Sequence, residues 1–520
     1  MLKRLKLWLI VGLLGAAAAV FTQTVHAAID FTVVVDSTGN TGIYTSVALD
    51  ADGIPVISYF NQSDNTLKLA DCQTPACTEF ETRTVPNTGS VTGYTSLELD
   101  ASGHPVITYW RSGSLGLAVC DDLICAAPTV RVVDDAGIVG ANNALELNSA
   151  GNPVIAYESS SVPYKVKLAI CSDPTCASRT IRELASGPDP YSFIALALDA
   201  ADNVVVSYYD TGLDELQVAT CSDPACTTPT VTTVDSNGDV GLYTSVAVTP
   251  YGTPAISYYD RTGENLKLAV CGTPTCSQRS LYVVDGSGDV GRDTSLTLDA
   301  TGAPVIAYAD TTNNALKLAT CDSLFCSNPT IRTLDAGSDN RRFMSIVLDE
   351  KGSPVISYHD DDGDNLNLYR AYTPIVPNSD FDAPLTAWSL IANGGGDRQI
   401  CLFEGCGVLL RGSGGTELIR TVLPVETLPA ANWTLTLALG GYELPAGGAI
   451  GARLEFLQGD VPVAQSDCLV TQRGTFDTTT ITCAAATAPA DYDALRISVG
   501  WQGLDTGLLF LDAVDLSVTN

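Results

Sequence analysis

Residues 244–294 contain the segment that decides the fold, TSVAVTPYGTPAISYYDRTGENLKLAVCGTPTCSQRSLYVVDGSGDVGRDT. Its core is h-x-G-x-P-h-h-S-Y, where h is apolar, followed about ten residues later by L-K-L-A-x-C-x4-C. The pattern recurs seven times between Thr45 and Tyr372 with a period of about 50 residues. Each period contains short alternating apolar and polar runs, as half-buried β-strands do. A repeat of this length is typical of a propeller blade.

Each repeat is predicted to form four strands joined by short turns. The first turn carries Gly or Asn, which supply positive φ, and the second strand usually begins with Pro, whose missing N–H costs least there. The seventh repeat lacks a fourth strand, and residues 31–36, FTVVVD, match the missing one. We therefore predict an all-β chain in which residues 28–372 form a seven-bladed β-propeller, closed by this N-terminal strand so that no sheet edge stays open.

The first 27 residues have the composition of a secretory signal peptide. Lys3, Arg4 and Lys6 precede an apolar run from residue 7 to residue 21, and a V-x-A site ends at Ala27. The alternative is an uncleaved anchor, but the run is shorter than the roughly 20 residues that span a bilayer. We expect cleavage after Ala27 and a secreted or cell-surface protein without a membrane span in the mature chain.

The sixteen cysteines fall into pairs by their spacing. An even number of cysteines in an exported chain predicts disulfides. Zinc is the competing interpretation, but each pair is separated from the next by a whole repeat and few histidines are present. The expected bridges are Cys72–Cys77, Cys120–Cys125, Cys171–Cys176, Cys221–Cys226, Cys271–Cys276, Cys321–Cys326, Cys401–Cys406 and Cys468–Cys483.

The net charge of −32 argues against a nucleic-acid partner, because phosphate binding needs a basic face. An acidic coat favours solubility instead. We expect a monomer whose partner is a glycan or another surface polymer. No cofactor is expected apart from structural calcium.

Two loops of each blade should emerge on one face of the propeller and carry the candidate binding residues. One loop contains D-x-x-G-x-x-G and ends in the column Tyr44, Tyr94, Asn143, Phe193, Tyr243, Asp293 and Phe343. Aromatic rings beside carboxylates would suit sugar recognition, while the alternative is that repeated residues fill repeated packing positions. The other loop adds the candidates Trp110, Tyr209, Tyr259, Asp210, Asp260 and Asp310.

Metal binding and catalysis have weaker sequence support. Hard oxygen ligands for calcium cluster at residues 235–239, 285–289 and 360–364, but none of these segments has the D-x-[DN]-x-[DN]-G spacing. His359 beside Asp360 is the candidate acid or base, and a solvated loop histidine is the alternative. Paired carboxylates for glycoside cleavage also stay open, since only geometry could identify a pair.

The repeats resemble those of secreted bacterial seven-bladed propellers with an ISYYD…LKLA pattern, here Ile256 to Asp260 and Leu266 to Ala269. The resemblance covers about two thirds of the chain. It implies the fold and an extracellular binding or surface role. The chain lacks the S-x-D-x-G-x-T-W box of sialidases, the Trp-Asp ending and the kelch glycine pair.

Residues 373–377 are a Pro-rich linker, and residues 378–520 form a second predicted domain. NSDFD at 378–382 and LDAVDLSV at 511–518 resemble the first and last strands of galactose-binding-like jelly rolls, as in carbohydrate-binding modules. The resemblance implies a β-sandwich in which Asp380 and Asp512 lie close together, where a structural calcium is common. Trp433, Tyr442 and Trp501 are sugar-stacking candidates, with core packing as the alternative.

Three functions remain open from the sequence. The first is an exported, non-catalytic binding protein for glycan or another surface polymer. The second is a propeller glycoside hydrolase or polysaccharide lyase with an appended carbohydrate-binding module. The third is a structural surface protein. Binding is preferred because the chain has no G-x-S-x-G motif and no metal-ligand histidine cluster.

Overall fold

The computed structural model describes residues 29–75, 77–337, 339 and 341–372, and residues 389–519 except 392–397, 403–404, 412–415, 425–430 and 503–507. The predicted signal peptide, the linker and Asp380 lie outside these ranges. The chain divides into two compact units, of which one spans Asp30–Ala371 and the other contains Tyr372–Asn520. All elements in the described ranges are β-strands.

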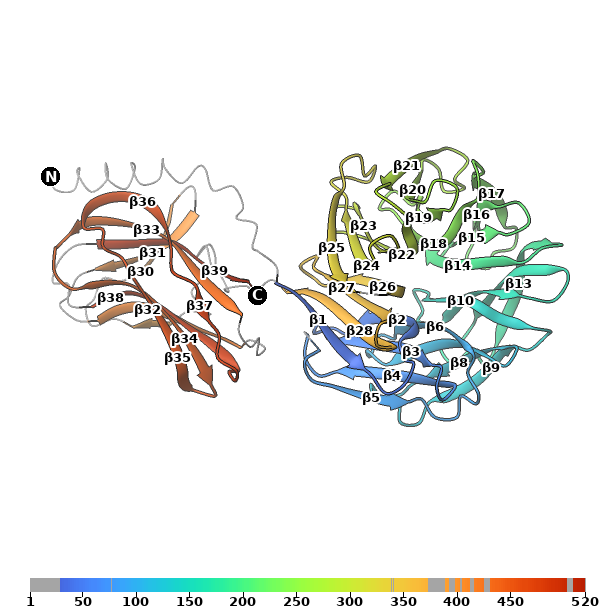
Figure 1. The fold of residues 1–520 in the computed structure, drawn as a ribbon, viewed down its shortest axis with the longest axis horizontal. Helices are drawn as coiled ribbons and strands as arrows, with labels where there is room; N and C mark the ends of the chain where they lie inside the picture. Colours follow the sequence, from blue (N-terminus) through green and yellow to red (C-terminus); the bar gives the residue numbers. More distant parts are fainter. Residues whose placement is uncertain are drawn as a thin grey trace. The chain divides into compact units, whose positions relative to one another are not determined.

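Within residues 29–372, seven four-stranded antiparallel sheets surround an axis, as Figure 1 shows, with one strand of each sheet innermost. The first three blades are β2 (Ile43–Leu49), β3 (Pro55–Asn61), β4 (Thr66–Cys72) and β5 (Phe80–Thr84); β6 (Gly93–Leu99), β7 (Pro105–Arg111), β8 (Ser114–Val119) and β9 (Thr129–Asp134); β10 (Val139–Leu147), β11 (Pro153–Ser159), β12 (Tyr164–Cys171) and β13 (Arg179–Gly187).

The next three blades follow the same order. They are β14 (Tyr191–Leu198), β15 (Val204–Asp210), β16 (Glu215–Thr220) and β17 (Thr230–Asp235); β18 (Val240–Val248), β19 (Pro254–Asp260), β20 (Asn265–Cys271) and β21 (Arg279–Asp285); β22 (Val290–Leu298), β23 (Pro304–Asp310), β24 (Ala315–Thr320) and β25 (Thr330–Ala336).

The seventh sheet has the order β1-β28-β27-β26, so its outer strand comes from the other end of the propeller sequence. This sheet combines β1 (Ile29–Asp36) with β26 (Arg341–Leu348), β27 (Pro354–Asp360) and β28 (Asn365–Tyr372). Neighbouring blades are also joined at the axis, where serine hydroxyls accept hydrogen bonds from backbone N–H groups. Val47 N–H donates to Ser345 Oγ at 3.1 Å across the seam between blades one and seven. Leu97 N–H donates to Ser46 Oγ at the same distance between blades one and two.

Buried Asp–Tyr–Lys triads connect several neighbouring blades. Asp134 on β9 accepts hydrogen bonds from Tyr157 Oη and Lys167 Nζ of the next blade, each at 2.7 Å. Burial alone would raise the pKa of Asp134, but the Lys167 ammonium, a backbone N–H and the Tyr157 phenol lower it below its usual value. Equivalent triads are Asp36–Tyr59–Lys68, Asp235–Tyr258–Lys267 and Asp285–Tyr308–Lys317.

Blades two and four lack both charges of the triad. At the aspartate position stand Pro86 and Ala185, and the residues paired with Tyr109 and Tyr208 are Gly116 and Gln217 instead of lysine. A buried lysine without its carboxylate would cost several kcal/mol, and no blade keeps the lysine without the aspartate. In blade seven, where Asn367 stands at the lysine position, Asp335 pairs with Arg341 Nε at 2.9 Å instead. The aspartates of the D-x-x-G loops therefore belong to the packing between blades.

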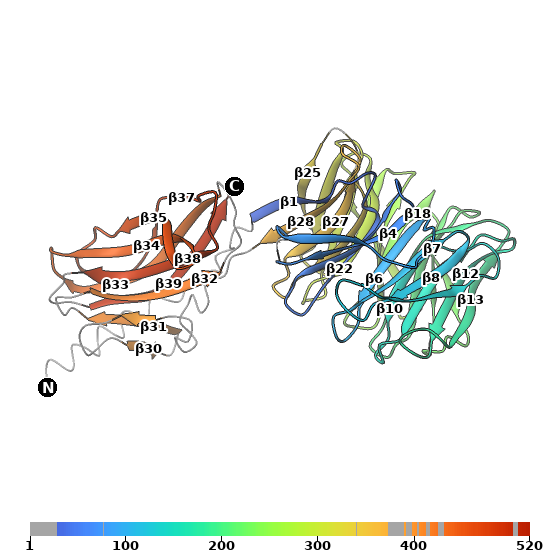
Figure 2. The ribbon, with the colours of Figure 1, turned by 90° about the horizontal axis from the view of Figure 1, so that it is seen from below.

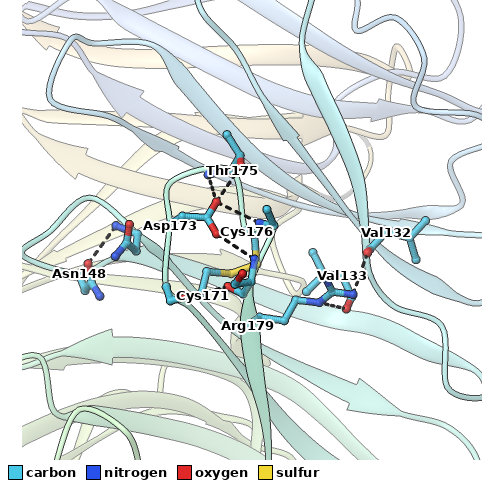
Figure 3. The surroundings of a disulfide bond; sticks show 12 residues. Val132, Val133, Asn148, Cys171, Asp173, Thr175, Cys176 and Arg179 are labelled. Atoms are coloured by element: carbon cyan, nitrogen blue, oxygen red, sulfur yellow. Dashed lines mark hydrogen bonds between the residues drawn. A yellow bond between two sulfur atoms is a disulfide. The ribbon is translucent and has the colours of Figure 1, made fainter.

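The C-x4-C segments form the predicted bridges at the ends of the third strands. Figure 3 shows Cys171–Cys176, where Asp173 accepts hydrogen bonds from the backbone of Thr175 at 3.1 Å and of Ala177 at 3.0 Å. The structure confirms the bridges Cys72–Cys77, Cys120–Cys125, Cys171–Cys176, Cys221–Cys226, Cys271–Cys276, Cys321–Cys326 and Cys468–Cys483. Cys401 and Cys406 lie opposite each other in a hairpin, and their bridge stays a prediction.

The second unit is a sandwich of two antiparallel sheets, which can be followed in Figures 1 and 2. One sheet orders β29 (Ser389–Ile391), β32 (Thr416–Pro424), β38 (Ala494–Gln502), β34 (Ala449–Gln458) and β35 (Val461–Leu469). The other orders β30 (Arg398–Leu402), β31 (Gly405–Arg411), β39 (Leu508–Thr519), β33 (Asn432–Leu444) and β36 (Gly474–Thr482), and β37 (Ala486–Thr487) pairs with β33.

The two candidate tryptophans of the sandwich fill its core. Trp433 is completely buried and its indole N–H donates to Tyr492 Oη at 3.2 Å, while Trp501 is 3% exposed. Because neither ring has a free face, the sugar-stacking prediction for Trp433 and Trp501 is wrong. The side chains of Tyr442 and Asp512 lie outside the described residues.

Candidate functional site

Every blade carries a bulge near the end of its innermost strand that faces the predicted binding loops. In blade one, the pairing of β2 with β3 shifts register between Ile43 and Ser46, and the other blades shift at the equivalent position. At each bulge one residue has a φ between 47° and 53°; these seven residues are Tyr44, Tyr94, Asn142, Phe193, Tyr243, Asp293 and Phe343. We call them the collar.

Positive φ is costly for bulky side chains, by about 1 kcal/mol or more per residue. Its repetition in all seven blades means that the surrounding sheet imposes it. Backbone strain of this kind clusters at binding and catalytic sites. The bulge places the collar side chains at the mouth of the central channel, where all seven line one pocket.

In blade three, the collar residue is the one before the predicted residue. Asn142, and not Asn143, occupies the bulge of blade three. Asn143 instead points between blades, where its amide donates to the carbonyl oxygen of Tyr94 and accepts from Thr108 Oγ1, both at 2.7 Å. The glycine spacing indicates Asn142, because Gly140 precedes Asn142 by two residues, as Gly42 precedes Tyr44.

The collar side chains contact one another around the axis. The Tyr44 ring stacks on that of Tyr94 at 4.1 Å between centroids and lies 4.5 Å from Phe343. The ring centroids of Phe193 and Tyr243 lie 4.3 Å apart. The pocket that they line has a volume of about 440 Å³, within the range of small-molecule sites.

Asn142 and Asp293 interrupt the aromatic collar with polar groups. The Asn142 amide donates to Glu158 Oε2 at 2.8 Å, which fixes its orientation. Burial raises the pKa of Asp293 to about 6, despite the nearby Arg342 guanidinium, which lowers it. The charged residues that line the pocket within the described chain are Asp293 and Arg342.

Most candidates from the second loop have structural roles, and their predicted ligand contacts are wrong. Tyr209 and Tyr259 are buried, and Tyr259 Oη donates to Asp289 Oδ1 at 2.7 Å. Asp310 is 1% exposed and pairs with Lys317 Nζ at 2.8 Å; Asp260 likewise faces Lys267.

Two further second-loop candidates support neighbouring groups. Asp210 Oδ1 accepts from the backbone of Gly212 at 3.0 Å and so closes its own turn. The half-buried Trp110 ring lies edge-on to Tyr94 at 6.0 Å between centroids, behind the collar. Neither Asp210 nor Trp110 lines the pocket. Of the predicted ligand-binding residues, Tyr44, Tyr94, Phe193 and Tyr243 therefore remain.

His359 is a buried residue, and the solvated-loop alternative is wrong. It is 3% exposed, its Nδ1 lies 2.6 Å from the carbonyl oxygen of Thr41, and its Nε2 lies 3.0 Å from Asp361 Oδ1. Asp360 does not pair with it but accepts from Arg341 Nη1 at 2.6 Å. Asp361 is thus the partner that the sequence did not indicate.

The calcium interpretation finds no support in the propeller. Asp235 and Asp285 bind lysine ammonium groups, and Arg341 pairs with Asp360 and Asp362. Across the described ranges, no three His, Cys, Asp or Glu residues are grouped to hold a metal ion.

None of the described residues forms a helix that could cross a membrane.

Comparison with known proteins yields distant structural likeness. No protein-family model and no curated protein matches the chain. Similar solved structures include an exo-β-1,3-galactanase from Phanerochaete chrysosporium, at 12% identity over 72% of this chain and 95% of that one, with a TM-score of 0.31. A protein of unknown function from Dyadobacter fermentans has 11% identity, coverage of 67% and 99%, and a TM-score of 0.42.

A polysaccharide lyase described as an ulvan lyase has 12% identity, coverage of 67% and 96%, and a TM-score of 0.43. At these identities and scores the fold assignment rests on the sheet topology, and no function is transferred from these proteins. The chain is thus an all-β protein with a seven-bladed propeller, and its family is not assigned.

Proposed function

We propose that this protein is exported and binds a glycan at the mouth of the propeller channel. The observation that carries the proposal is the collar, in which five aromatic rings, one amide and one carboxyl group face a single pocket. Aromatic rings pack against the apolar faces of pyranose rings, and the polar groups at their edges can bind sugar hydroxyls. The disulfides fit an oxidising compartment.

The states of the phenol groups support recognition of a hydroxyl-rich ligand. Burial raises the pKa of Tyr44, Tyr94 and Tyr243 above the usual value, so these phenols stay protonated at physiological pH. Each can donate one hydrogen bond and accept another. The part of the sandwich in binding stays a prediction, and its two buried tryptophans do not support it.

The test is titration calorimetry with a panel of neutral and acidic oligosaccharides. Tyr94→Ala and Tyr243→Ala should each weaken binding by about five- to thirtyfold, because ring stacking and hydrogen bonding of an aromatic residue contribute on the order of 1–2 kcal/mol. Tyr251→Ala is the matched control, since Tyr251 is 80% exposed in a turn between β18 and β19. Equal losses in all three variants, or no binding by the wild type, would contradict the proposal.

A second candidate function is cleavage of the bound glycan. Asp293 favours it, because a carboxyl group with a pKa of about 6 can act as a general acid near neutral pH. Asp361, whose Oδ1 lies 3.0 Å from His359 Nε2, would be the second carboxyl group. Product formation from each oligosaccharide that binds, followed by mass spectrometry, tests this function. Asp293→Asn should abolish turnover while binding persists, and wild-type protein that leaves every bound oligosaccharide intact would exclude it.

A further inference from the structure

Arg342 lines the collar pocket, and the ion pair that its guanidinium group makes within the protein is long. It precedes the collar residue Phe343 on β26, and its guanidinium carbon lies 5.4 Å from the Phe343 ring centroid. The side chain is 49% exposed, so the group is reachable from solvent. It forms an ion pair with Asp361, in which Nη1 lies 3.6 Å from Oδ2, beyond ordinary hydrogen-bond distance.

Other arginines around the mouth are held more tightly. Arg261 Nη1 lies 2.9 Å from Asp239, and Arg292 Nη2 lies 2.8 Å from Asp289. Arg341 pairs with three carboxylates at 2.6 to 3.2 Å. Arg342 differs from these neighbours because its ion pair with Asp361, at 3.6 Å, is longer than theirs, so its N–H groups can turn to a ligand in the pocket at a lower cost.

The charge of Asp361 is already shared with His359. Nδ1 of His359 faces the Thr41 carbonyl oxygen, which only accepts, so Nδ1 carries a proton. Nε2 faces Asp361 Oδ1 at 3.0 Å, and this contact also requires a proton on one of the two atoms. Whether that proton sits on the imidazole or the carboxyl group, the pair has no net charge. Asp361 is thus a weak counter-charge for Arg342.

We propose that Arg342 binds an acidic group on the glycan, either the carboxylate of a uronic acid or a sulfate ester. This inference rests on the proposed glycan binding at the collar. Guanidinium groups bind both anions in a bidentate geometry, and the Phe343 ring supports the guanidinium plane from one side. The adjacent pocket would hold the sugar ring that bears the acidic group.

Asp293 gives the interaction a pH dependence. Around Asp293 stand Arg342 and Asp361 together with Arg292, and the Tyr44 and Tyr243 phenols stay neutral. The pKa of Asp293 is raised to about 6, so it is mostly neutral at pH 5 and charged at pH 7.5. An anionic ligand should therefore bind more tightly at pH 5 than at pH 7.5, and Asp293→Asn should remove the difference.

The experiment is calorimetric titration of the full chain with three probes, namely oligogalacturonate, the matching neutral galacto-oligosaccharide and dextran sulfate. The wild type should bind oligogalacturonate, dextran sulfate or both more tightly than the neutral probe. Arg342→Gln should lower the acidic affinities by at least about tenfold, as expected for a lost charge-assisted hydrogen bond, and leave the neutral affinity unchanged. Arg342→Lys should restore part of the loss, since it keeps the charge without the bidentate geometry.

Arg261→Gln is the matched control, because Arg261 lies on the same face, is 57% exposed and is paired with Asp239. If neutral and acidic probes bind equally and Arg342→Gln changes neither affinity, the inference is overturned while glycan binding stands. An equal effect of Arg261→Gln would also overturn it, because the effect would then reflect overall charge. If none of the probes binds, both the inference and the proposed function fail.

Discussion

The aspartates of the inter-blade triads and the collar residues lie eight positions apart at the two ends of the same loop. The aspartates hold neighbouring blades together, whereas the collar residues face the pocket. Asp36 is buried and fully occupied by Tyr59 and Lys68, whereas Tyr44 is half-exposed, strained at a φ of 53° and aimed at an open pocket. Both recur from blade to blade. Repetition therefore does not separate structural residues from candidate binding residues. Nor does positive φ, which the second cysteine of each C-x4-C bridge of the propeller also has, whereas the contacts of the side chain within the protein do.

The largest effect should come from removing the outer strand of the seventh sheet. Deleting residues 30–36 takes away the partner of β28 and the carboxylate of Asp36 together. The ring would then have an open seam, and we expect a far lower melting temperature by circular dichroism. Asp36→Ala separates the lost ion pair from the lost strand and should cost less. Equal melting temperatures for deletion and wild type would refute the closure.

A smaller loss should follow from breaking one triad. Asp235→Ala removes the nearer carboxylate of the buried Lys267 ammonium and leaves Asp260 Oδ2, at 3.6 Å, as its counter-charge, which should lower the free energy of unfolding by up to about 3 kcal/mol in urea titrations. The double variant Asp235→Ala with Lys267→Gln copies the pair Ala185 and Gln217 of blades three and four. It should recover most of the loss. A double variant no more stable than the single one would show that the two charges are not coupled.

Stability should depend on pH in two windows with opposite signs. Bound lysines and phenols keep the pKa values of Asp36, Asp134, Asp235 and Asp285 below normal despite burial, so this stability exists above pH 4 and is lost on further acidification.

On the innermost strands β6 and β10, burial and the neighbouring Glu146 carboxyl group raise the pKa of Glu98 to about 8, and burial raises that of Glu146 to about 7. Their folded state binds more protons than the unfolded chain, so this stability is present at pH 4 and lost as the pH rises through 7 to 8. Glu98→Gln with Glu146→Gln should flatten the melting temperature between pH 5 and 8. An unchanged slope would mean that these carboxyls are not coupled to folding.

The smallest effect concerns collar strain. At Phe193, with a φ of 53°, Gly should be more stable than Ala by about 1 kcal/mol, because glycine adopts this conformation without a Cβ clash. Both variants should lose the ring and hence weaken glycan binding equally. Denaturant unfolding and calorimetry on this pair separate backbone strain from ligand contact. Equal stabilities would show that the conformation at residue 193 is not strained.

Sequence reasoning predicted the fold well and the site in part. The period, the turn glycines and the C-x4-C spacing are local features, so they indicated the blades and the bridges directly. The strand supplied by residues 31–36 could also be found, because its pattern matched a gap in the last repeat. In contrast, Tyr209, Tyr259 and Asp310 have the composition of binding residues, but each faces a partner from another strand or loop.

The sequence by itself determined how many blades there are, how each strand is patterned and which cysteines can meet, because these depend on spacing within one repeat. Only the tertiary structure decided which repeated polar groups are buried and which reach the channel. The contact of His359 with Thr41 needs the first and last blades to meet, whereas Asp361 belongs to the same blade as His359. The hydrogen bond to Thr41 places a proton on His359 Nδ1, so Nε2 shares a second proton with Asp361. This shared proton weakens Asp361 as a counter-charge for Arg342, and the freedom of Arg342 to bind a ligand therefore depends on the seam between the first and last blades.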